Sequence, residues 1–125
     1  MKQTDEKKIK EAKKELADLA EKRGGSVLSF HKRIANDPGL VKAFSDSYEN
    51  SKSSLEHLSP KMIELILFAL GCSKGVPTTI QTHGKLAYEK GATVDELGEV
   101  MRLVFFYCGA ASLIPAAEIF EELDA

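Results

Sequence analysis

The sequence contains no tryptophan and only two cysteines among its 125 residues. Cys72 and Cys108 are too few for the disulfide framework of a small secreted domain, and this favours the cytoplasm as the compartment. The charged N-terminal segment also lacks the apolar core of a signal peptide, which predicts the same location. We therefore expect a cytoplasmic protein that folds on hydrophobic burial alone, for which a chain of this length suffices.

An excess of positive charge is also missing. Lysine and arginine number 17 against 19 aspartate and glutamate residues, so no nucleic-acid partner is expected. The longest apolar region, residues 100–117, is interrupted by Arg102, Gly109 and Pro115, so no membrane span is expected. The three histidines share no metal-ligand spacing, and no glycine-rich phosphate loop is present. We expect neither a metal nor another cofactor.

Period-two alternation is absent, so strands are not expected, and apolar residues recur at helical spacing instead. This pattern predicts an all-α fold of six or seven helices. The first helix ends at Gly24 and Gly25, a short second one carries Phe30 and Ile34, and the third begins at Asp37-Pro38. The polar residues 49–57 are expected to form a loop.

The second half of the chain carries the more apolar helices. Ser59-Pro60 opens a helix that is apolar on all sides, so we expect other segments to pack around it on every side. Residues 71–75 are expected to end this helix. The next helix runs from near Pro77 to Gly91, and Thr93 to Glu96 form a capping box for the sixth. A last helix is expected to restart at Pro115 and end at Leu123. A single chain of this size has too few other helices to bury two such apolar helices, and this favours a homo-oligomer that buries them between subunits.

Glu64 stands in the otherwise apolar run from Met62 to Cys72. An unpaired buried carboxylate costs several kcal/mol, about 3 or more, so Glu64 needs a partner or a task. His83 lies on the next helix, and its ring could contact the Glu64 carboxylate either directly or through a bridging water. A carboxylate that orients an imidazole makes a proton shuttle, but the same pair can also serve only to order the core.

Thr79 and Val76 precede His83 by four and seven residues, so the three share one helix face. A pocket at His83 would therefore be lined by Thr79 and Val76. It would also lie near a helix N-terminus, which favours an anion such as a carboxylate.

Two segments together resemble a known family: "ELILFALGCSKGVPTTIQTHGKLAYEKGATVDELGEVM" and "FFYCGAASLIPAAEIFEEL". They resemble the carboxymuconolactone decarboxylase and alkylhydroperoxidase D superfamily over residues 59–123. The resemblance implies an alkylhydroperoxidase D-like helical bundle that assembles as trimers or hexamers. It also implies one domain over residues 1–125, with N-terminal helices in 1–58 and the core motif region in 59–123.

The peroxiredoxin-like branch of this superfamily uses a C-x-x-C pair, with a glutamate and a histidine that relay protons to it. The matching positions here are Val76 and Thr79 for the cysteines, and Glu64 and His83 for the relay. The thiols are missing while the relay is present. Cys72 and Cys108 stand in apolar surroundings, where they are expected to be buried and inert, although a displaced redox pair stays open.

Three functions remain open from the sequence. The first is a family member that acts on a small molecule through a Glu64–His83 proton relay, with Thr79 in the pocket and doubtful thiol peroxidase activity. The second is a lyase that decarboxylates a carboxylated lactone or keto acid. The third is a ligand-binding or structural oligomer without catalysis.

Overall fold

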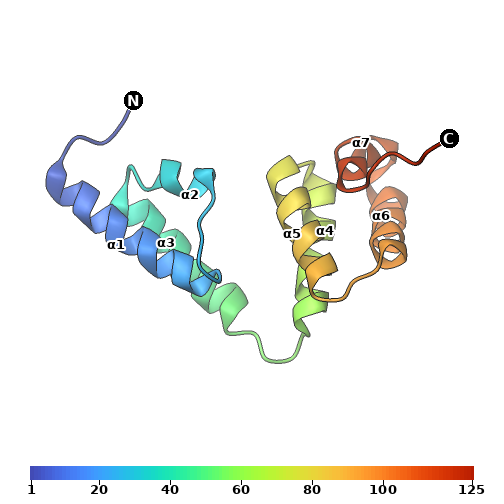
Figure 1. Ribbon diagram of the computed structural model, residues 1–125, viewed down its shortest axis with the longest axis horizontal. Coiled ribbons are helices and arrows are strands. Elements are labelled where there is room, and N and C mark those ends of the chain that lie inside the picture. Colours follow the sequence, from blue (N-terminus) through green and yellow to red (C-terminus); the bar gives the residue numbers. More distant parts are fainter. The chain divides into compact units, whose positions relative to one another are not determined.

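Figure 1 shows the computed structural model of the chain, which describes residues 1–125 and contains helices joined by turns and coil. Seven α-helices confirm the predicted all-α class. The chain forms two compact units, residues 1–56 and 57–125. None of the helices is both long enough and apolar enough to cross a bilayer.

The first unit contains α1 (Glu6–Lys22), α2 (Ser29–Ile34) and α3 (Pro38–Tyr48). Helices α1 and α3 lie side by side (Figure 1). The carboxylates of Asp5 and Asp37 accept hydrogen bonds from the first free backbone N–H groups of α1 and α3, as helix N-caps do. The small core of this unit is made of apolar side chains, chiefly Ala12, Leu19, Ala35 and Val41.

His31 is buried in this first unit, and its ring takes part in holding α2. The Leu28 N–H donates to His31 Nδ1 at 2.9 Å, which satisfies a backbone group at the start of α2. The ring centroid lies 5.0 Å from those of both Phe30 and Phe44. Burial, and next the positive charge of Arg23, lower the pKa of His31. The fold therefore requires the neutral ring.

The second unit contains α4 (Pro60–Lys74), α5 (Pro77–Glu89), α6 (Val94–Cys108) and the short α7 (Leu113–Ala116). Helix α5 packs along the length of α4, and α6 contacts α4 as well. Gly75 ends α4 with φ 65°, a left-handed conformation that glycine adopts without strain, so the chain turns directly into α5. The core of this unit is built from α4, α5 and α6 and includes Leu65, Phe68, Cys72, Ile80, Ala87, Leu97 and Met101.

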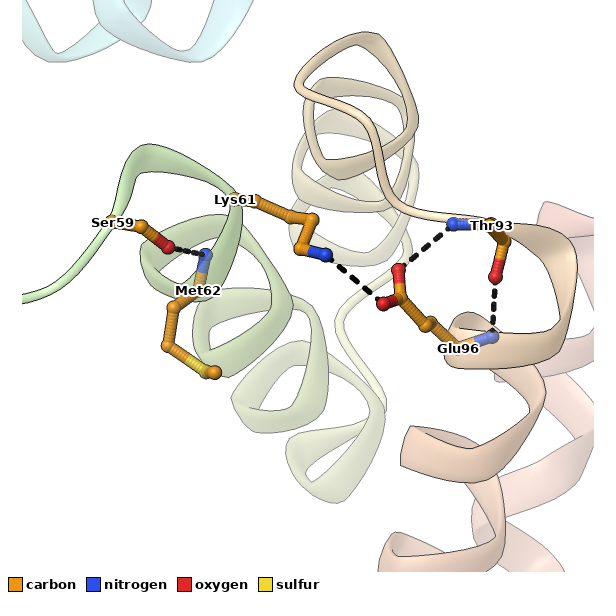
Figure 2. Close-up of polar contacts among 5 residues, drawn as sticks. All are labelled: Ser59, Lys61, Met62, Thr93 and Glu96. Carbon is orange, nitrogen blue, oxygen red and sulfur yellow. Dashed lines mark hydrogen bonds and ion pairs between the residues drawn. The ribbon is translucent and has the colours of Figure 1, made fainter.

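The starts of α4 and α6 are joined by a polar contact (Figure 2). Lys61 Nζ donates to Glu96 Oε1 at 3.0 Å, and Glu96 Oε2 accepts from the Thr93 N–H at 3.0 Å. Thr93 Oγ1 in turn accepts from the Glu96 N–H, which completes the predicted capping box. The hydrogen bonds from Lys61 and Thr93 lower the pKa of Glu96. One carboxylate thus caps α6 and pairs with α4.

Two predicted boundaries were wrong. Glu49–Ser53 is a π-helical turn that continues α3 rather than a loop, with Lys52 Nζ 5.1 Å from the Tyr48 ring centroid. The last helical turn ends at Ile119 instead of Leu123, since Phe120 is extended (ψ 148°) and packs half-buried against the core. By contrast, α4 ends at Lys74 with Gly75 as its C-cap, which confirms the end predicted within residues 71–75.

The prediction that the fourth helix is covered on every side was also wrong within a single chain. Its side chains Met62, Ile66 and Leu70 are exposed, and they lie on one face at four-residue spacing. Helix α6 likewise buries one side only. Each of these apolar helices therefore leaves a hydrophobic face outside the chain's own core.

Protonation of His31 should destabilise the first unit. The folded state binds the proton more weakly than the unfolded state, because the pKa of His31 is lowered in the fold. The stabilisation that the neutral ring provides is complete above the pKa of histidine in the unfolded chain, about 6.5, and is lost as the pH falls below that pKa. Chemical denaturation followed by circular dichroism should show a free energy of unfolding that declines between pH 7.5 and 5.

The matched variants are His31→Gln and His57→Gln, since His57 is exposed and lies outside both cores. His31→Gln should lower stability at pH 7.5 by about 1 kcal/mol, the net value of one hydrogen bond, and should flatten the pH dependence. His57→Gln should leave the decline in place. An unchanged decline in His31→Gln would contradict the assignment.

Candidate functional site

Glu64 and His83 meet at the interface of α4 and α5. His83 Nδ1 lies 2.6 Å from Glu64 Oε2, so the hydrogen bond is direct rather than bridged by water. The side chain of Glu64 is 4% exposed and that of His83 is 19% exposed. The carboxylate is therefore inside the unit, while the imidazole reaches the surface.

The helices place these two groups by simple geometry. Ser59 Oγ accepts from the Met62 N–H and starts α4, so Glu64 falls in the first turns of the helix. Helix α5 returns antiparallel after the turn at Gly75, and this brings its second half alongside the first half of α4. Glu64 shares its helix face with Phe68, one turn later, which belongs to the buried core. The pair therefore sits at the edge of the hydrophobic core.

The hydrogen bond distinguishes the two ring nitrogens of His83. A carboxyl group is ordinarily a stronger acid than an imidazolium, so the shared proton resides on Nδ1 and the Glu64 carboxylate accepts it. In the neutral ring Nε2 then carries the lone pair. The arrangement can take up a proton at Nε2 and hold the resulting imidazolium against a buried negative charge.

Thr79 and Val76 occupy different environments from the pair. Thr79 is half-buried on the first turns of α5 and packs with its methyl group against Gly71 of α4. Val76 is the residue just before α5 and is 41% exposed. Thr79 therefore lies one helical turn from His83 toward the start of α5, with its position set by packing against α4.

The two cysteines differ sharply. Cys72 is fully buried in the core, and burial raises its pKa to about 11. Cys108 is exposed at the end of α6, which corrects the expectation that both thiols are in the core. Both are free thiols. A nucleophilic thiolate is strongly disfavoured at Cys72.

The second unit has two surface grooves whose walls do not include the pair. One, of about 700 Å³, runs between α4 and α6 and is almost entirely apolar, with Ile66, Leu70 and Leu103 on its walls. The other, of about 790 Å³, lies between α5 and the C-terminal segment. Neither is lined by Glu64 or His83, and no three histidine, cysteine or acidic side chains converge as metal ligands do. Glu64 and His83 are thus not part of the walls of either groove.

Comparison with known proteins extends over most of the chain. The sequence model of the carboxymuconolactone decarboxylase family matches residues 38–122. An uncharacterized protein of Methanocaldococcus jannaschii, MJ1511, is 32% identical over 66 residues, which span 53% of this chain and 62% of that protein's length. The alkylhydroperoxidase AhpD core from Rhodospirillum rubrum superposes with a TM-score of 0.72 at 22% identity, over 98% of this chain and 92% of that one. That likeness shows a common fold.

Cys72 should be almost unreactive in the native protein. A pKa raised from 9 to about 11 lowers the thiolate fraction near neutral pH by about 100-fold, and burial blocks the reagent as well. In a Cys108→Ser variant, the rate of modification by a disulfide reagent should rise by at least about 100-fold on unfolding. The Cys72→Ser variant is the control for complete labelling of Cys108 in denaturant. Rapid native labelling of Cys72 would contradict its placement.

Proposed function

Since this chain belongs to the carboxymuconolactone decarboxylase family, we propose that it acts on a small molecule by proton transfer at His83, oriented by Glu64. The observation that carries the proposal is the 2.6 Å hydrogen bond between a buried carboxylate and a partly exposed imidazole. Buried ionisable groups with one solvent-reaching member are common in sites of acid–base chemistry.

In this proposal Nε2 of His83 is the atom that exchanges protons with the ligand. It removes a proton from a hydroxyl or an activated carbon of the substrate, and the ring becomes an imidazolium. The Glu64 carboxylate keeps Nδ1–H in place and stabilises that positive charge. The same nitrogen then returns the proton to the product. Thr79, one turn earlier on α5, is proposed to contact the ligand through its hydroxyl.

Thiol-based peroxide reduction fits these residues poorly. The C-x-x-C positions are Val76 and Thr79, and neither can become a thiolate or a resolving thiol. The buried, raised-pKa thiol of Cys72 does not replace them. We therefore propose little or no dithiol-dependent peroxidase turnover. Two free thiols suit a reducing compartment such as the cytoplasm.

A specific alternative is the decarboxylation of a carboxylated lactone or keto acid. The N-terminal turn of α5 presents backbone N–H groups near Thr79, and such a helix end favours a carboxylate. On loss of CO₂ the electron pair of the broken C–C bond forms an enolate, which the His83 imidazolium would protonate at carbon. This uses the same pair, with His83 as the acid.

The test is a panel of small carboxylated lactones and keto acids assayed for CO₂ release and for substrate proton exchange. His83→Ala should lower turnover by about 10²- to 10⁴-fold, the usual contribution of a general acid or base. His57→Ala is the matched histidine control and should match wild type. Ligand binding without any turnover in wild type would favour a non-catalytic protein, and peroxide reduction abolished by Cys108→Ser would contradict the thiol-free chemistry.

We also propose that the chain assembles into a homo-oligomer through the faces that α4 and α6 leave uncovered. Contiguous exposed apolar surface of this kind marks interaction sites. Several of the largest exposed hydrophobic side chains of the second unit lie on these helices: Met62, Ile66, Leu70, Leu103, Phe105, Phe106 and Tyr107. The trimer or hexamer implied by the family resemblance is a specific form of this proposal.

A charge placed on the α6 face should therefore disrupt assembly. Phe106 is 84% exposed, so Phe106→Glu introduces a charge without disturbing the core of the unit. Light scattering coupled to size-exclusion chromatography should show the variant at a lower oligomeric mass than wild type. Lys85→Glu, on the exposed surface of α5, is the control and should keep the wild-type mass. A monomeric wild type would contradict the proposal.

A further inference from the structure

Gly71 lies at a point of close contact between α4 and α5. A Cβ placed on Gly71 would lie 2.8 Å from Thr79 Cγ2, 3.1 Å from Thr79 Cβ and 3.1 Å from the backbone nitrogen of Ile80. The two helices therefore touch here with no room for a single methyl group. Glycine inside a helix is less stable than alanine by about 1 kcal/mol, so its presence at this point calls for a reason in packing.

We propose that Gly71 is a positioning residue for the Glu64–His83 pair. The close approach that it allows holds the backbone of α5 near that of α4, and this keeps His83 Nδ1 within 2.6 Å of Glu64 Oε2. This role of Gly71 rests on the proposed function, because the position of His83 matters for chemistry only if the pair transfers protons. The contact lies at Thr79 and Ile80, one turn before His83 on the same helix.

The expected displacement is large enough to matter. Ordinary contacts of a Cβ begin near 3.4 Å, so an alanine at position 71 would have to move Thr79 Cγ2 away by about 0.6 Å. Thr79 is β-branched and has few alternative rotamers, and the Ile80 nitrogen belongs to the helix backbone. The helix itself must therefore shift. A hydrogen bond of 2.6 Å lengthened by that amount passes beyond the range of a short, charge-assisted bond.

Gly84 provides an instructive comparison, since it follows His83 directly on α5. A Cβ there would meet Ile119 Cδ1 at 2.5 Å, Ile119 Cγ1 at 2.8 Å and Phe68 Cδ2 at 3.2 Å. The close atoms there all belong to side chains, chiefly Ile119 in the C-terminal segment, whereas a Cβ on Gly71 also meets the backbone nitrogen of Ile80 on α5. Gly84→Ala should thus disturb the pair less than Gly71→Ala, although its nominal overlap is larger.

The experiment uses nuclear magnetic resonance of the ring of His83. A proton held between an imidazole nitrogen and a carboxylate resonates at low field, and its position reports the strength of the hydrogen bond. Wild type should show this resonance, and Glu64→Gln should lose it or move it upfield. Gly71→Ala should also move it upfield or abolish it. Gly98→Ala is the matched control, because that helical glycine has no atom within 4 Å of an added Cβ.

A compensating variant separates positioning from general loss of structure. Thr79→Ser removes Cγ2 but keeps the hydroxyl, so Gly71→Ala combined with Thr79→Ser should recover at least part of the low-field signal. Circular dichroism shows which variants fold. If Gly71→Ala alone does not fold, the double variant provides the test, and a folded double variant with the low-field resonance supports the steric contact.

The outcomes distinguish this inference from the proposed function. An unchanged resonance in folded Gly71→Ala, or a folded double variant without any resonance, overturns the role of Gly71 and leaves the proton relay standing. A wild type with no resonance that depends on Glu64 removes the hydrogen-bonded pair, and the proposed function fails with it.

Discussion

The structure of the second unit depends on one constraint: a carboxylate on the inner face of α4 must be satisfied by a group on α5. Glu64 is almost completely buried, and an unpaired carboxylate there would be strongly unfavourable. The hydrogen bond to His83 meets this requirement and at the same time ties the two helices together. The same interaction leaves the imidazole of His83 partly exposed at the surface of the unit.

The chain shares the fold of the AhpD core and belongs to the carboxymuconolactone decarboxylase family. Its sequence keeps a glutamate–histidine pair but has no C-x-x-C pair of thiols. The positions that would carry paired thiols hold Val76 and Thr79, and the packing gives Thr79 a structural contact with Gly71. The buried Cys72 is suited to packing rather than to redox exchange. Proton transfer is therefore the chemistry that we propose for this chain.

The apolar surface has a different origin. Helix α4 is largely hydrophobic and α6 is largely apolar from Val100 onward, and a unit of this size buries only one face of each. The remaining faces include Leu103, which is 70% exposed, and Tyr107, which is 89% exposed. Exposed aromatic and aliphatic side chains on this scale are costly in water. This is the physical reason to expect that other copies of the chain cover them.

Local signals in the sequence determined the helix starts, because a cap depends on residues within one turn: Asp37-Pro38, Ser59-Pro60 and Thr93 with Glu96 all lie where they were predicted. They also singled out Glu64 as a residue in need of a partner. Only the tertiary structure decided that His83 is that partner at 2.6 Å and that the chain leaves the helix after Ile119. These outcomes depend on the distance between packed helices and on burial against distant segments. Neither quantity is encoded by the spacing of residues along the chain.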